Sequence, residues 1–216
     1  MSASRESPGD VPYRQVRAVY DEESITVYQA FAAEISVPAV RAGTFAHAPF
    51  GLDRMTWIKP SFLWMMYRSG WATKPGQEHV LSVRIRRDGF EKALSRAVLS
   101  HFEPETYPDH ATWETLKTAS PVRVQWDPER DLTLQQLPWR SLQLGLSGSI
   151  VREYVHDWVI GIDDITDRAR EIHEAVRLGQ VDAARAALPQ ERPYSLPLEL
   201  AAHIGAGPRD DRRPRS

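Results

Sequence analysis

The segment 54–71 brings aromatic rings and fixed positive charges together at close spacing. Its residues include three of the seven tryptophans, a tyrosine, and the cations Arg54, Lys59 and Arg68. Burying such cations is costly unless they are paired or lie at the edge of a cleft. The segment therefore predicts a pocket for a ligand that is both aromatic and anionic, with Trp57 or Tyr67 stacking on it. The alternative is that the rings pack in the core.

A second candidate segment lies near the N-terminus, in the run Tyr13-Arg14-Gln15-Val16-Arg17-Ala18. Arg14 and Arg17 offer planar guanidinium donors, and Gln15 offers an amide, which together suit a phosphate or a carboxylate. The alternative is a solvated edge of the first structural element.

The third candidate segment is Arg123-Val124-Gln125-Trp126-Asp127-Pro128-Glu129-Arg130, followed by Arg140-Ser141-Leu142-Gln143. Alternation predicts a strand over 122–126, and Asp127-Pro128 predicts a turn after it. Asp127 and Glu129 then lie at a strand end, where either carboxylate could act as a base or orient a ribose hydroxyl. The alternative is an ordinary turn with surface ion pairs.

The elements that must position these residues are a mixture of strands and helices. Strands are expected at 25–29, 55–59, 80–86 and 142–146, and helices at 33–41, 62–69 and from Asp88 through Val98. Residues 101–119 read as loop, and the part after residue 148 reads as helical. Because the spacing is not a regular strand–helix–strand repeat, the sequence predicts an α+β fold in one compact domain, with small mixed or antiparallel sheets and a helical C-terminal part.

Composition bounds the function further. The 216 residues suit one domain, over about 13–204, with disordered tails at 1–12 and 205–216. There is no cysteine, the net charge is −2, and no apolar run is long enough for a membrane span. The N-terminus lacks a secretory signal, so we expect a cytoplasmic protein without a membrane partner.

Common catalytic motifs are absent from the chain. It has neither a P-loop nor a Gly-x-Gly-x-x-Gly helix start, and Gly145-Leu146-Ser147-Gly148-Ser149 departs from a nucleophile elbow at its last residue. None of the seven histidines pair at the spacing of a zinc helix, so we expect no metal site.

Several of these motifs resemble the family catalogued as domain of unknown function 4291. The resemblance rests on 13–18, on Val27-Tyr28-Gln29-Ala30, on the segment 54–71, on 125–130 and on 140–146. It covers about residues 13 to 200 and adds Tyr28 and Gln29 to the candidate binding residues. The family name carries no established activity.

A weaker similarity is to small ADP-ribosyltransferase-like domains, carried by the strand ending Val27-Tyr28-Gln29, the helix after it and Ala42-Gly43-Thr44-Phe45. Such domains bind NAD in a cleft between two small sheets, which implies NAD as a cofactor or substrate. Gln29 stands where that pattern has a histidine, and Glu129 would be the late glutamate.

The sequence thus predicts a nucleotide-binding, NAD-like group transferase with an aromatic and cationic cleft, acting on a nucleic-acid or protein acceptor. Arg14, Arg17, Lys59 and Arg68 would hold phosphates, and Glu129 or Asp127 would be the catalytic carboxylate. The alternative is a non-catalytic module that binds a protein or a single-stranded nucleic acid.

Overall fold

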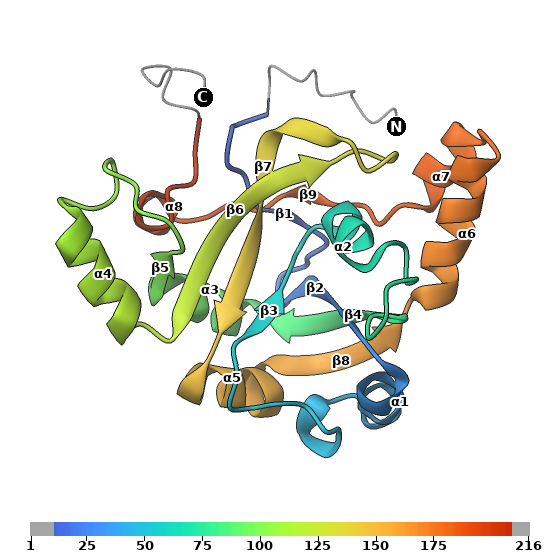
Figure 1. Ribbon diagram of the computed structural model, residues 1–216, viewed down its shortest axis with the longest axis horizontal. Coiled ribbons are helices and arrows are strands. Elements are labelled where there is room, and N and C mark those ends of the chain that lie inside the picture. Colours follow the sequence, from blue (N-terminus) through green and yellow to red (C-terminus); the bar gives the residue numbers. More distant parts are fainter. Residues whose placement is uncertain (1–10, 209–216) are drawn as a thin grey trace.

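The computed structural model describes residues 11–208, so the predicted tails at 1–12 and 205–216 lie largely outside the described residues, in 1–10 and 209–216. Within the described range, strands and helices alternate irregularly around small mixed and antiparallel sheets, as Figure 1 shows. The α+β prediction is therefore confirmed. Ordered structure continues beyond residue 204, where the sequence interpretation had placed the start of a tail, because Gly207 exchanges backbone hydrogen bonds with Arg14.

Three sheets form among residues 11–208. One is antiparallel and joins β2 (Ser24–Phe31), β4 (His79–Arg86) and β8 (Val159–Asp164) in that order. A second has the order β3 (Thr56–Ile58), β7 (Gln136–Leu146), β6 (Val122–Arg130) and β5 (Ala97–Leu99), with only the β5–β6 pair parallel. A third pairs β1 (Arg17–Ala18) with β9 (Arg192–Pro193).

Helices pack around these sheets. In chain order they are α1 (Ala33–Ala42), a 3-10 turn at Phe45–His47, α2 (Phe62–Ser69), α3 (Arg87–Ser95), α4 (His110–Ala119), α5 (Gly148–Glu153), a π-helical turn at Tyr154–Trp158, α6 (Thr166–Arg177), α7 (Val181–Ala187) and α8 (Leu198–His203). Among the described residues, no helix combines the length and the apolar composition that crossing a membrane requires.

The two larger sheets meet at one point. Tyr28 on β2 and Lys59, directly after β3, exchange backbone hydrogen bonds in an antiparallel bridge. Beyond this bridge the sheets diverge, since β2 continues with β4 and β3 continues with β7. The end of β2 and parts of β3, β6 and β7 therefore line a common space beside Lys59.

The helix α2 closes one side of this junction. Pro60 disfavours a helical Lys59, Ser61 caps the helix by accepting from the Trp64 amide at 3.1 Å, and Gly70 ends it at a φ of 58°. Trp71 follows in the left-handed region, outside the helix, and stacks on His173 of α6 with the ring centroids 5.1 Å apart. Core packing therefore accounts for Phe62, Met66 and Trp71, which are buried together.

Four local expectations were wrong. Residues 110–119 form the helix α4, since Asp109 caps it and Trp113 anchors its buried face. Asp127-Pro128 does not turn the chain, because β6 runs on to Arg130 past a register shift between Pro128 and Arg130. Residues 97–99 are β5, not the end of a helix. Residues 159–164 are the strand β8, so the C-terminal part is helical only in pieces.

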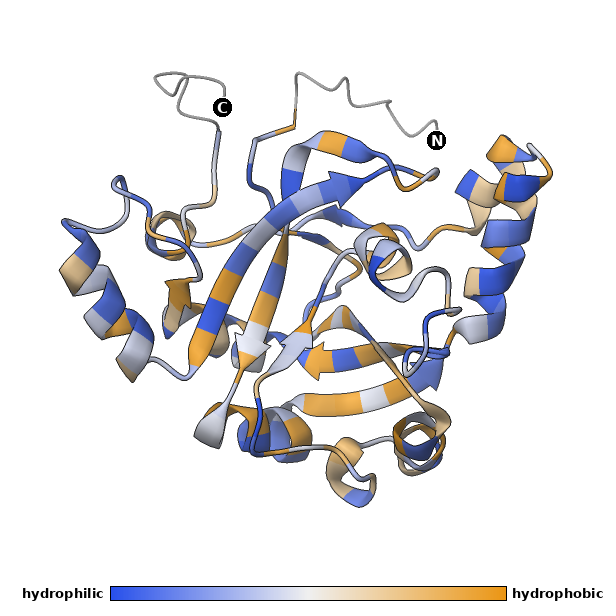
Figure 2. Cartoon of the chain, viewed as in Figure 1, coloured by the Kyte–Doolittle hydropathy of each residue, from blue (hydrophilic) through white to orange (hydrophobic). Residues whose placement is uncertain are grey.

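Colouring by hydropathy marks the end of β6 as different from its start. In Figure 2 the first half of the strand alternates between hydrophobic and hydrophilic residues, and its second half is mostly hydrophilic. Val122 and Val124 are fully buried in the main core, whereas the strand beyond Trp126 carries Asp127, Glu129 and Arg130. The polar half of β6 lies where the sheet approaches α2, which places its carboxylates close to the junction.

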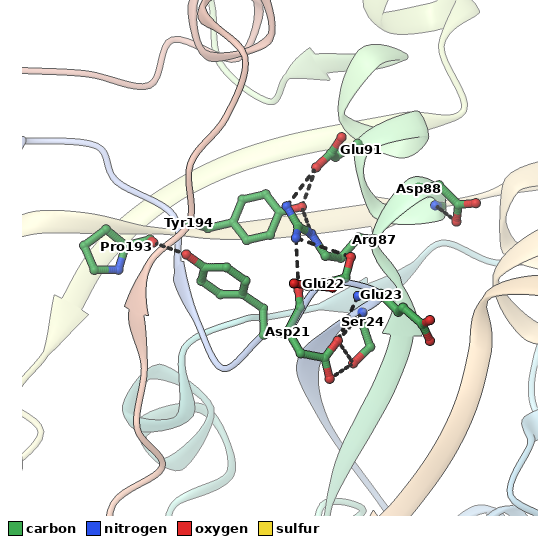
Figure 3. A network of polar contacts seen from close by, with 11 residues as sticks. Asp21, Glu22, Glu23, Ser24, Arg87, Asp88, Glu91, Pro193 and Tyr194 are labelled. Atoms are coloured by element: carbon green, nitrogen blue, oxygen red, sulfur yellow. Dashed lines mark hydrogen bonds and ion pairs between the residues drawn. The ribbon is translucent and has the colours of Figure 1, made fainter.

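A polar network around Arg87 joins α3 to the segments around Asp21 and Tyr194 (Figure 3). Arg87 Nε donates to the Tyr194 hydroxyl at 2.9 Å, and its guanidinium lies 4.9 Å from the Tyr194 ring and 5.4 Å from the Tyr20 ring. Tyr194 in turn donates to Glu91 of α3. The polar groups of this network bond to one another, so we assign the network a structural role.

Candidate functional site

A cavity of about 620 Å³ opens beside the junction of the two larger sheets. Its wall is built from β2, β3, β6, β7, α2 and the loops before β3 and before β4. Eight candidate residues of the sequence analysis line it: Gln29, Arg54, Trp57, Lys59, Arg68, Gln125, Asp127 and Gln143. The cavity thus brings together residues that are more than 100 positions apart in the chain.

Two arginines border the cavity from opposite ends of the segment 54–71. Arg54 precedes β3, and Arg68 lies in the last turn of α2. Both residues are exposed. Neither forms a salt bridge with another described residue. Their positive charges are therefore available to an anionic ligand at the entrance.

Lys59 lies deeper in the wall and is only 3% exposed. Its ammonium nitrogen Nζ is 3.2 Å from the centroid of the Trp64 ring and donates a hydrogen bond to Oε1 of Gln143. Burial sets the pKa of Lys59 well below its ordinary value of 10.5, and the positive charge of Arg68 lowers it further, while Asp127 and Glu129 oppose the shift. Lys59 therefore loses its proton more readily than an exposed lysine.

Asp127 places a carboxylate in the same cavity. Gln125, two residues earlier on β6, donates to its Oδ1 at 2.8 Å and so orients the group. The other oxygen, Oδ2, is buried and has no hydrogen-bond partner among the described residues. A buried carboxylate oxygen without a donor is costly, which makes Oδ2 a natural acceptor for a hydroxyl or an amine of a ligand.

Gln29 lines the cavity but is fully engaged by the protein. Its Oε1 accepts from the buried Tyr154 hydroxyl at 2.7 Å, and its Nε2 donates to Thr56 Oγ1 at 2.9 Å and to the Trp57 carbonyl at 3.2 Å. These bonds tie β2 to β3. Gln29 thus supports the cavity wall, and its amide has little capacity left for a ligand.

Trp57 supplies an aromatic surface in the wall. Its ring lies against β7, where a Cβ added to Gly145 would come within 3.0 Å of two ring carbons and within 2.7 Å of the Met55 sulfur. Because glycine leaves this space empty, the indole can lie close to the strand. Trp57 is half-buried and lines the cavity, so part of its ring is open to a ligand.

Glu129 lies behind the cavity, not in it. Its Oε1 accepts from the Ser61 hydroxyl at 2.8 Å and from the Arg130 amide at 2.8 Å. Burial raises the pKa of Glu129, and those hydrogen bonds partly oppose the shift. The register shift beside Pro128 separates the environment of Glu129 from that of Asp127, although the two residues are neighbours on one strand.

A second carboxylate, Glu191, joins Glu129 at the start of α2. Its Oε1 accepts from the Phe62 amide at 2.7 Å. Burial, and then the negative charge of Glu129, raise the pKa of Glu191 to about 8. We call Glu129 and Glu191 the carboxylate pair. Glu191 and Ser61 accept from the Phe62 and Trp64 amides in the first turn of α2, and Glu129 accepts from the Ser61 hydroxyl.

The remaining candidate residues line other parts of the molecule. Arg14 forms an ion pair with Glu103 at 2.7 Å, and Gln15 accepts from Arg17 at 3.0 Å. The positive charge of Arg17 acts on the carboxylate pair. Arg140 donates to the Tyr13 hydroxyl at 2.6 Å and to the Trp126 carbonyl at 2.9 Å.

The two candidate tyrosines also lie outside the cavity lining. The buried Tyr28 packs edge-on against Phe62, with ring centroids 5.6 Å apart. Tyr67 carries the Arg130 guanidinium 3.5 Å above its ring centre.

Sequence reasoning missed part of the lining. Trp64 was not among the candidate residues, although its ring forms the support for Lys59. Phe31, Phe50 and Gln77 carried no signal that distinguished them from packing or loop residues. Glu191 was missed because it lies outside every motif. Among residues 11–208, no three His, Asp or Glu side chains converge as metal ligands would.

The comparisons with known proteins bear on family and not on activity. A search of curated proteins found no match. The family model described as "Domain of unknown function (DUF4291)" matches residues 15–194, which include every residue of the cavity lining and the carboxylate pair. The chain therefore belongs to the DUF4291 family.

Proposed function

We propose that the cavity binds a nucleotide-like ligand, with NAD as the leading example, and that the protein transfers a group from it. The observation that carries the proposal is the meeting of Arg54, Arg68, Trp57 and Asp127 around one hollow of about 620 Å³. That volume lies within the roughly 300–1,000 Å³ common for small-molecule sites.

The lining residues suggest a division of roles. Arg54 and Arg68 would hold phosphate oxygens at the entrance, since guanidinium groups bind phosphate in a bidentate manner. Trp57 would stack on a base, and Asp127 Oδ2 would accept a ribose hydroxyl. Lys59 is the third cation of the lining, but it is buried and its Nζ already donates to Gln143, so the two exposed arginines suit the phosphate-holding role better.

The transfer step would use Asp127 and not Glu129. An acceptor nucleophile from a protein or a nucleic acid would bond to the ribose carbon, the base would leave with the electron pair of the glycosidic bond, and Asp127 would take the acceptor's proton. Asp127 lines the cavity, whereas the Glu129 carboxylate is held by Ser61 and the Arg130 amide. The position of the cavity between two small sheets suits the ADP-ribosyltransferase-like analogy.

Isothermal titration of the full chain with NAD, ATP and a short RNA tests the proposal. Binding of NAD or ATP that weakens in Arg68→Gln supports it. Silence from all three ligands at millimolar concentration overturns it. Binding of the RNA alone would overturn it in favour of a non-catalytic single-strand binding module. Cytoplasmic residence stays a prediction of the sequence.

A further inference from the structure

Lys59 is anchored on rigid backbone at the centre of the molecule. Its carbonyl accepts from the Tyr28 amide at 2.7 Å, its own amide donates to the Tyr28 carbonyl at 3.3 Å, and Pro60 follows it. Because both sheets hold this residue, the root of its side chain has little freedom. Such anchoring is typical of a positioned reactive group and is more than a surface lysine needs.

The end of the side chain is enclosed on two sides. The Trp64 ring lies 3.2 Å from Nζ, and Gln143 accepts one of its N–H groups. A neutral amine has two N–H groups and one lone pair. The Gln143 carbonyl and the face of the indole can receive the two N–H groups, which leaves the lone pair for the cavity.

The charged groups around Nζ act on its ammonium charge in both directions. Arg68 repels an ammonium charge there, and Asp127 and Glu129 attract it, but burial outweighs both and places the pKa well below 10.5. Desolvation in an apolar pocket beside another cation is a recognised way to activate a lysine as a nucleophile. The nearest carboxylate in the cavity, Asp127, keeps one oxygen without a partner and could move protons for such an amine.

We propose that Lys59 is a nucleophilic amine that forms an imine with an aldehyde or ketone carrying a phosphate or carboxylate group. The anion would be held by Arg54 and Arg68, and in that respect the inference rests on the proposed function. The ligand class is then an anionic carbonyl compound, of a size that the cavity of about 620 Å³ admits.

The step balances within the site. The Nζ lone pair forms a bond to the carbonyl carbon, the carbonyl oxygen gains a proton, and the nitrogen loses one, giving a carbinolamine. The hydroxyl group then leaves as water with a proton relayed by Asp127, and Asp127 recovers a proton as the nitrogen gives up its second one, so the products are the imine and water; addition of water reverses the step. No oxidant, reductant or metal is required.

Lysine labelling of the full chain tests the inference sharply, because the sequence contains only four lysines: Lys59, Lys74, Lys92 and Lys117. The probe is pyridoxal 5′-phosphate, an anionic aromatic aldehyde, followed by borohydride reduction and peptide mass spectrometry near pH 7. We expect an adduct at Lys59 to form at least about tenfold faster than at the other three, since the cavity would hold the phosphate beside Nζ and a lysine with a lowered pKa is neutral more often. Lys59→Arg should remove the adduct.

Lys117 is the matched control. Its Nζ also lies over a tryptophan, 4.3 Å from the ring centre of Trp113, but on the helix α4, away from the cavity. Lys117→Arg should leave the labelling of Lys59 unchanged. Because Lys59→Arg could fold poorly, the rate on the wild-type chain is also followed with pH, and we expect the rate at Lys59 to level off at a lower pH than the rates at the surface lysines.

The outcomes separate the two proposals. If Lys59 stays unlabelled while the other lysines react, and NAD or ATP still binds, the amine inference is overturned alone. If Lys59 reacts equally fast with pyridoxal, which lacks the phosphate, and Arg68→Gln changes nothing, the amine is supported but the anion-holding role fails. If the adduct needs the phosphate and forms about tenfold more slowly in Arg68→Gln, both the reactive amine and the anion-holding role are supported.

Discussion

The cavity and the carboxylate pair both border α2 and contain carboxylates, yet they differ in how those carboxylates are satisfied. In the pair, Ser61 and backbone amides occupy carboxylate oxygens of Glu129 and Glu191. In the cavity, Asp127 Oδ2 has no partner among the described residues, and Arg54 and Arg68 form no salt bridge with them. Burial with internal partners indicates a structural role, and burial without them indicates a place for a ligand.

The backbone of β6 explains why Asp127 and Glu129 have different surroundings although they lie on one strand. Asp127 and Glu129 would point to the same face of a regular strand. The register shift beside Pro128 breaks that regularity, so one residue lines the cavity and the other meets Ser61. Shifts of this kind are known to redirect side chains next to functional sites.

Replacing each of the two carboxylates by its amide, in separate variants, is the strongest test of this difference. Asp127→Asn should lower the rate of nicotinamide release from NAD by about 100-fold or more, because it removes the base that we propose for the transfer step. Glu129→Gln should change that rate by less than about threefold, since its amide oxygen can still accept from Ser61 and Arg130. The release of nicotinamide is followed by chromatography. Equal losses in both variants would contradict the division.

Removing a cation at the entrance should have the next largest effect. Arg68→Gln or Arg54→Gln should weaken nucleotide binding by about 1.5–3 kcal/mol, the value of a charged hydrogen bond, and should reduce its dependence on salt. Titration calorimetry at two ionic strengths measures both. Arg84→Gln, an exposed arginine on β4 outside the cavity, is the matched control and should bind like the wild type.

The carboxylate pair should show itself in the pH dependence of stability. The folded-state pKa of Glu191, about 8, lies above its ordinary value of 4.5. The contribution of the protonated side chain to the free energy of unfolding is therefore fully present below about pH 4.5 and is lost as the pH rises through about 8. Glu191→Gln should remove about 1–2 kcal/mol of that loss, the figure being reduced for partial exposure. Chemical denaturation between pH 5 and pH 8 measures it. A variant that loses stability with pH as steeply as the wild type would refute the assignment.

Adding a methyl group behind the Trp57 ring should have the smallest effect and tests whether that ring contacts the ligand. Gly145→Ala would place a methyl group within 3.0 Å of the Trp57 ring and would push the indole toward the cavity. We expect nucleotide affinity to fall a few-fold and stability to fall by about 1 kcal/mol. Tryptophan fluorescence quenching by the ligand reports the change, and an unaltered affinity with an unaltered melting temperature would show that the ring is not confined there.

Local chemistry made several elements predictable. Ser61 and Gly70 marked the two ends of α2, Gly43 marked the end of α1 with a φ of 66°, and alternation located β2, β4 and the start of β6. The helix α4 escaped prediction because Pro104 and Pro108 made its surroundings resemble a loop, and β8 escaped because a π-helical turn leads directly into it.

By itself, the sequence determined the fold class, the family and eight of the residues that meet around the cavity, because residue type and spacing along the chain express propensity, capping and alternation. Only the tertiary structure decided which charged groups share a space. Arg14 and Arg140 are drawn into pairs with Glu103 and Tyr13, Glu129 is closed off by Ser61, and Lys59 is buried against Trp64. Burial and partners depend on contacts between segments far apart in the chain, and these set the charge and the reactivity of each group.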